Sequence, residues 1–239
     1  MKRTAEILTA SIVAIGDFNP AIFSPDWLER NGLIGREDAD DVREKTKDEK
    51  PKGQSMLVSH EVTAFETSWF ALQILGKQFS LTSKGAVSPA LRDLAKGIFD
   101  LVPHTPVTAV GLNFMGHFKL ETEKDWHELG DRLAPKRVWE TLYPDKSAGL
   151  QELTVLLQDH VRGEQPKSKD HKRITVQPSN KLRFGIYLLY NDHHEVTDAQ
   201  LLGLTSAEQV ASIINNDWEN SWQDSERVFK GLLSLTLGG

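Results

Sequence analysis

The segment Val107–Leu133 has the sequence VTAVGLNFMGHFKLETEKDWHELGDRL and sets the pattern for the whole chain. An apolar run leads to a glycine, an Asn-Phe pair and a second Phe follow, and an Asp-Trp pair opens a predicted helix. A similar order occurs between Ser11 and Leu33, in SIVAIGDFNPAIFSPDWLERNGL. Because the shared residues come in the same order, we interpret the two segments as copies from an internal duplication.

Residues 107–118 predict a strand in which Gly111 and Gly116 mark points of bulging or close backbone approach. Each copy also predicts a loop with two phenylalanines and one asparagine, over residues 17–23 in the first copy and 112–118 in the second. Related halves would place these loops at equivalent ends of the sheet. Aromatic anchors beside an amide that can bond to backbone suit the recognition of an extended peptide or a partner surface. The alternative is structural: the rings fill the sheet ends and the amides cap turns.

The rest of the chain favours an α+β fold. We expect two related halves, residues 1–103 and 104–239, either as two units or joined in one compact domain. Hairpin strands between helices favour antiparallel β-sheets with helices packed on one face, rather than a doubly wound parallel sheet. Apolar residues recur every four positions from Val210 to Trp222, which predicts a long C-terminal helix over residues 206–235.

Three shorter segments carry more local expectations. Residues 35–53 hold charges of both signs and almost nothing apolar, so we predict a solvated loop. Pro135 should kink or split the helix predicted over residues 125–143. The polar run Asp192–Glu195 is expected to follow a strand at residues 182–190 and to form a turn leaving the sheet.

Composition excludes several classes of protein. The 239 residues include no cysteine, which rules out disulfides, thiolate metal sites and cysteine nucleophiles. A net charge of −6 argues against a nucleic-acid partner. We expect no membrane span, and we interpret the apolar segment after Lys2-Arg3 as a first strand rather than a signal peptide. These features predict a cytoplasmic protein.

The histidines are the main candidates for chemistry. His193 and His194 resemble metal ligands, but adjacent strand residues point to opposite faces, so both could bind one ion only from an irregular loop. His117 could act as a general base. No nucleophile elbow, phosphate-binding loop or dinucleotide fingerprint occurs. We therefore expect no metal and no cofactor, and the sequence favours a non-enzymatic function.

Our leading hypothesis is a binding or adaptor protein that recognises a protein or peptide partner. An alternative is a hydrolase that uses His117 or the His193–His194 region, and another is a small-ligand sensor with a cavity between the sheet and the long helix. Self-association into a homo-oligomer is a further option. The candidate partner-binding residues are Phe18, Asn19, Phe23, Asn113, Phe114, Phe118, Trp218 and Trp222.

Two stretches also resemble a sporadically distributed family of uncharacterised bacterial proteins. They are the strand leading into Gly111-Leu112-Asn113 and the helix end SERVFKGLLSL, residues 225–235. That family has no assigned reaction, so the resemblance implies no catalytic residues. It implies a bacterial origin and a cytoplasmic location.

Overall fold

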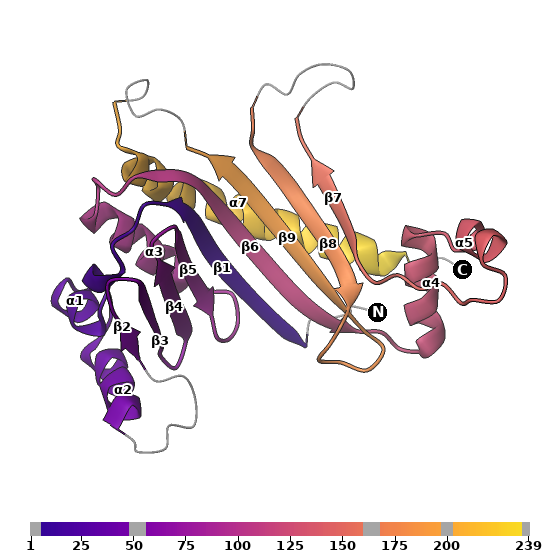
Figure 1. The fold of residues 1–239 in the computed structure, drawn as a ribbon, viewed down its shortest axis with the longest axis horizontal. Helices are drawn as coiled ribbons and strands as arrows, with labels where there is room; N and C mark the ends of the chain where they lie inside the picture. Colours follow the sequence, from indigo (N-terminus) through magenta and orange to yellow (C-terminus); the bar gives the residue numbers. More distant parts are fainter. Residues whose placement is uncertain (1–5, 48–55, 160–167, 197–202, 236–239) are drawn as a thin grey trace.

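A computed structural model describes residues 6–47, 56–159, 168–196 and 203–235. Within these residues the chain forms one nine-stranded antiparallel sheet in the order β2-β3-β4-β5-β1-β6-β9-β8-β7. The central pair is β1 (Ile7–Gly16) and β6 (Val107–Lys119), which run antiparallel along almost their whole length (Figure 1). The predicted antiparallel α+β fold is confirmed.

The sheet extends outward from this central pair in matching order on both sides. On one side lie β5 (Gln78–Ser83), β4 (Phe70–Leu75), β3 (Val62–Glu66) and the short β2 (Leu57–Val58). On the other side lie β9 (Gly185–Glu195), β8 (His171–Pro178) and β7 (Leu153–Leu157). In chain order, each half runs from a central strand through two helices and further strands to a final helix.

The final helices, α3 (Pro89–Leu101) and α7 (Ser206–Ser234), lie on the same face of the sheet and pack against each other (Figure 1). The long C-terminal helix was predicted correctly. Its residue Trp218 is fully buried, with its ring 5.1 Å from that of Phe114 on β6. Ile12 and Leu112 of the central strands point to the same side and are also fully buried. This side holds the main core.

The strand predicted over residues 107–118 is confirmed as β6, and the loop expected over residues 112–118 is wrong, because these residues belong to that uninterrupted strand. Its glycines permit close packing instead of ending the strand. A Cβ atom on Gly116 would lie 2.5 Å from the Phe118 ring, and one on Gly111 would lie 2.7 Å from the Asn191 amide. Asn19 does follow the end of β1, whereas Asn113 pairs with Ser11 in mid-strand. The expected correspondence of the two loops therefore fails.

The charged segment 35–53 was also predicted wrongly where the structure describes it, since Arg36–Lys47 forms helix α2. Residues 48–53 lie outside the described residues. Ala39 and Val42 are buried in the core, while Arg43 forms ion pairs with Asp26 and Glu29. These partners come from α1 (Pro25–Arg30), which follows a short 3-10 turn at Pro20–Ile22. Tertiary contacts thus order a segment whose own composition is loop-like.

The corresponding helices of the C-terminal half form an arm at the far end of the sheet (Figure 1). As predicted, the helical segment is split around Pro135, into α4 (Glu123–Leu133) and α5 (Arg137–Leu142). Trp126 on α4 donates a hydrogen bond of 3.0 Å to the carbonyl of Gly185, and Leu129 is buried. By contrast, α5 has no buried residue. None of the described helices is long and apolar enough to span a membrane.

Candidate binding face

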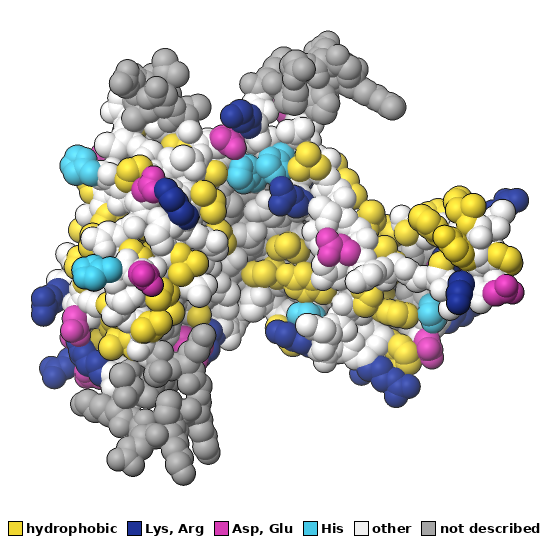
Figure 2. Space-filling model, in the orientation of Figure 1, with side chains coloured by type: hydrophobic (Ala, Val, Ile, Leu, Met, Phe, Trp, Pro, Cys, Tyr) yellow, Lys and Arg dark blue, Asp and Glu magenta, His cyan; other side chains and the backbone are white. Residues whose placement is uncertain are grey.

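The face of the sheet opposite α3 and α7 is open over its central strands. Among the described residues, no helix crosses this face over β1, β6 and β9 (Figure 1), and the space-filling view shows it as a hollow between the two ends of the molecule (Figure 2). Because side chains alternate along a strand, the open face carries the residues that point away from the core. A hollow of about 220 Å³ lies here. Its lining residues are Val13, Ile15, Ala109, Val110, Gly111, Asn113, Arg173, Leu189, Asn191 and His193.

A pair of amides lies at the centre of this hollow. The Asn191 Nδ2 atom donates a hydrogen bond of 2.8 Å to Asn113 Oδ1. Asn113 Nδ2 in turn donates to the carbonyls of Ser11 and Gly111, each at 3.3 Å. The absence of a side chain at Gly111 leaves the space that the Asn191 amide fills. No described group donates to Asn191 Oδ1, so this oxygen can accept a hydrogen bond from a ligand.

A basic group borders the amides on β8 and β9. The His171 and His193 rings stack with their centroids 4.4 Å apart, and Arg173 Nη2 donates to His171 Nε2 at 3.3 Å. Burial lowers the pKa of His193 below its ordinary value, so this ring is neutral at neutral pH. The positive charge here therefore comes from Arg173, which is exposed and has no carboxylate partner among the described residues.

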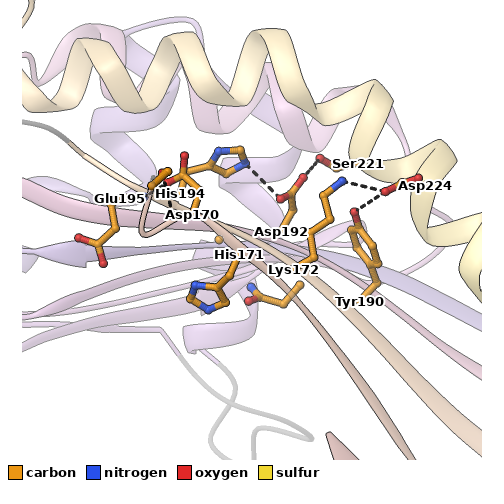
Figure 3. Close-up of polar contacts among 12 residues, drawn as sticks. Asp170, His171, Lys172, Tyr190, Asp192, His194, Glu195, Ser221 and Asp224 are labelled. Atoms are coloured by element: carbon orange, nitrogen blue, oxygen red, sulfur yellow. Dashed lines mark hydrogen bonds and ion pairs between the residues drawn. The ribbon is translucent and has the colours of Figure 1, made fainter. Parts of the chain in front are cut away.

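On the covered face, a second polar group fastens α7 to the sheet (Figure 3). Ser221 donates a hydrogen bond of 2.5 Å to Asp192 Oδ2, and His194 Nε2 lies 3.6 Å from Asp192 Oδ1. One turn further along α7, Asp224 Oδ2 accepts from Lys172 Nζ at 2.8 Å and from the Tyr190 hydroxyl at 3.0 Å. The hydrogen bond from Lys172 lowers the pKa of Asp224 to about 2. Burial acts to raise the pKa of Asp192, but His194 and Ser221 outweigh it and lower this pKa, so both carboxylates are charged acceptors.

The order of groups around Asp192 does not suit nucleophilic catalysis. In a serine hydrolase the histidine lies between the serine and the carboxylate, so that it can take the hydroxyl proton. Here the carboxylate lies between Ser221 and His194, and the serine proton already bonds to that carboxylate. This arrangement ties a helix to a strand and does not activate Ser221.

The other candidate histidines lie apart from one another. His193 and His194 do not follow the strand as predicted but belong to β9, where they point to opposite faces. Within the part of the chain that the structure describes, no three His, Asp or Glu side chains are grouped as metal ligands. His117 Nδ1 lies 2.8 Å from Ser179 Oγ, but that oxygen also accepts the N–H groups of Lys181 and Leu182. Ser179 thus stabilises a turn.

A second cavity, of about 500 Å³, lies beside α7 over the covered side of β8. It coincides with the place expected for the cavity of a small-ligand sensor. Its lining is mostly polar, with carboxylates from Asp159, Asp170, Asp192 and Asp217. Leu157, at the end of the edge strand β7, forms part of its rim.

Most of the predicted partner-binding residues turn out to be core residues. Five aromatic rings are buried, those of Phe18, Phe23, Phe114, Phe118 and Trp218. Trp222 is half-buried. Asn19 is exposed, but it follows the end of β1 and does not belong to the amide pair. The buried rings cannot meet a partner without unfolding, so their assignment as anchors is corrected. Asn113 alone of the predicted set lies on the open face.

Sequence reasoning missed Asn191, Arg173 and His171, which complete the open face around Asn113. The polar residues of 171–173 and 191–195 come in unbroken runs, so no alternation with apolar residues marks which of them face away from the core. No protein-family model matches the chain, and no curated protein does so either. Function is therefore inferred from the geometry.

Proposed function

We propose that this chain is a non-enzymatic binding protein that takes an extended segment of a partner protein along the open face of its sheet. The observation that carries the proposal is the amide pair Asn113–Asn191 in an uncovered hollow, beside the guanidinium of Arg173, which has no carboxylate partner among the described residues. The segment should carry an acidic side chain, because a guanidinium without a carboxylate partner favours an anion.

The chemistry of the surrounding residues supports this class of ligand. Val13, Met115 and Leu189 are half-buried and offer apolar contact along three adjacent strands. The free oxygen of Asn191 can accept a backbone N–H, while Arg173 can bind a carboxylate with two parallel hydrogen bonds. Apolar area together with a few placed polar groups is typical of peptide-recognition sites.

We also propose that the two halves arose by duplication. The supporting observation is the matching order of strands outward from β1 and β6 and of helices along the chain. Side chains with even numbers face the core in both central strands, so an alignment of the halves must shift β1 onto β6 by an even number of residues. A superposition under that condition that leaves Trp27 and Trp126 in unrelated positions would contradict the duplication.

The binding proposal predicts a charge-dependent choice of peptides. We expect the full chain, used to select from a displayed library of unstructured peptides, to enrich sequences with an acidic residue flanked by apolar ones. Changing Arg173→Glu should reduce binding of the enriched peptides by about 10- to 100-fold, because a like charge replaces an attractive one. Binding is measured by the fluorescence anisotropy of labelled peptides.

Arg36→Glu is the matched control, since Arg36 is exposed on α2 and, within the described residues, makes one long ion pair, with Asp40. This control should bind the peptides as the wild type does. Enriched peptides without acidic residues, or equal affinity of the Arg173→Glu protein, would contradict the proposal. Turnover of an ester or amide that is lost with His117→Ala or His193→Ala at unchanged stability would instead support the hydrolase.

A further inference from the structure

The arm formed by α4 and α5 presents an apolar surface that nothing in the described chain covers. Val138, Trp139, Leu142 and Tyr143 are each between 54% and 61% exposed. They gather on α5, at the tip of the arm, where Figure 2 shows a cluster of apolar side chains. A tryptophan and a tyrosine in one small cluster are residue types that dominate the energetics of protein interfaces. We call these four residues the arm patch.

A second bare apolar surface lies on the edge strand β7. Val155, Leu156 and Leu157 are between 40% and 51% exposed. Val155 and Leu157 pair with Ile174 and Lys172 of β8, so they point to the same side of the sheet as α7. An uncharged apolar strand at a sheet edge is a surface that proteins normally cover. We call Val155 and Leu157, with the adjoining acidic cavity, the seat.

The N-terminal half shows how such outer strands become covered. There α1 and α2 bury Leu28, Ala39 and Val42 in the core. Phe65 and Phe70, on the outer strands β3 and β4, are nearly or completely buried. In the C-terminal half, α4 and α5 hold the same place in the element order but extend away from the outer strands. Both the arm patch and the seat are therefore exposed. Two apolar surfaces are thus left uncovered by the residues that the structure describes.

We propose that a second copy of this chain provides the missing cover, with the arm of each copy lying on the seat of the other. Charge supports the pairing. Arg137 and Lys146 flank the arm patch without a carboxylate partner among the described residues, while four aspartates, among them Asp159 and Asp217, outnumber Lys172 and His194 in the lining of the seat cavity. A two-fold axis makes both arm–seat contacts at once, as in other exchanges of an element between identical subunits.

The proposal predicts a dimer that a substitution on either the arm patch or the seat disrupts. Light scattering after size exclusion should give twice the mass of one chain for the wild type. Leu142→Glu on the arm and Val155→Glu on the seat should each weaken association at least about 100-fold, because each buries a carboxylate in an apolar contact. Both side chains are exposed, so circular dichroism of the two monomeric variants should match that of the wild type.

Mixing the two variants separates exchange from other modes of association. The Leu142→Glu chain retains an intact seat and the Val155→Glu chain an intact arm, so their mixture should recover dimer through one arm–seat contact. Leu101→Glu, an exposed leucine at the end of α3, is the control and should remain dimeric. A single-chain mass for the wild type at up to about 100 μM, a dimeric Val155→Glu protein, or no recovery in the mixture would each overturn the proposal.

Discussion

Replacing Trp218 by alanine is expected to lower the free energy of unfolding by about 3–5 kcal/mol. Trp218 is 0% exposed and lies at the middle of α7, against Phe114 on the central strand β6. Truncation leaves a cavity between the long helix and the centre of the sheet, where the surrounding strands cannot collapse to fill it. Urea denaturation followed by circular dichroism measures the loss.

Trp222→Ala is the matched control for this prediction. It lies one turn further along α7 but is only half-buried, so it should cost less than half as much. The sequence gives the two tryptophans the same spacing and offers no reason to separate them. If Trp218→Ala costs less than about 1 kcal/mol, or if the two losses are equal, then α7 does not pack on the sheet as described.

Elements with a strong local signal could be predicted well. The stripe from Val210 to Trp222 repeats along α7 itself, and Pro135 breaks a helix whatever its surroundings. The strand over residues 107–118 was predicted, but Gly111 also suggested a loop after it, whereas the space next to Gly111 is filled by Asn191, a residue eighty positions away in the chain. Helix α2 was missed because its order depends on contacts of Arg43 with α1.

The candidate site depends even more on long-range pairing. Asn113, Asn191 and Arg173 come from β6, β9 and β8 and meet only because those strands align in one register. A shift of one residue would turn each side chain to the other face. For the same reason the sequence could not place Asp192 beside Ser221, whose helix crosses the strand it contacts. Local sequence patterns predict the helices and strands, but the candidate site also depends on the register in which β6, β9 and β8 pair.

Replacing Asp192 by alanine is expected to cost about 2–4 kcal/mol in free energy of unfolding near pH 6. The carboxylate is buried and accepts the Ser221 hydroxyl while lying beside His194. Burial alone would raise the pKa of Asp192, but the neighbouring His194 and Ser221 outweigh it and hold this pKa below the usual 3.8. Removing the carboxylate leaves the buried Ser221 hydroxyl without its acceptor and His194 without its ion-pair partner.

The cost should depend on pH in a defined way. Burial acts to lower the pKa of His194, but Asp192 outweighs it and the net pKa lies above the ordinary 6.5. A raised histidine pKa stabilises the fold below pH 6.5 and loses this effect as the pH rises through the folded value. A lowered aspartate pKa stabilises above pH 3.8 and loses its effect as the pH falls through the folded value. The stability gap between wild type and Asp192→Ala should therefore be largest between these limits.

Ser221→Ala separates the two contributions. It removes the hydroxyl donor and keeps the Asp192–His194 pair, so it should lower stability by about 1 kcal/mol and preserve the decline of stability above pH 6.5. The Asp192→Ala protein should lose most of that decline, because Asp192 outweighs Asp217 and Asp170 among the groups that raise the pKa of His194. Denaturant titrations of all three proteins at several pH values measure both effects. A gap for Asp192→Ala that is constant across the range would mean that His194 is uncharged in the folded protein and that Asp192 acts through Ser221 alone.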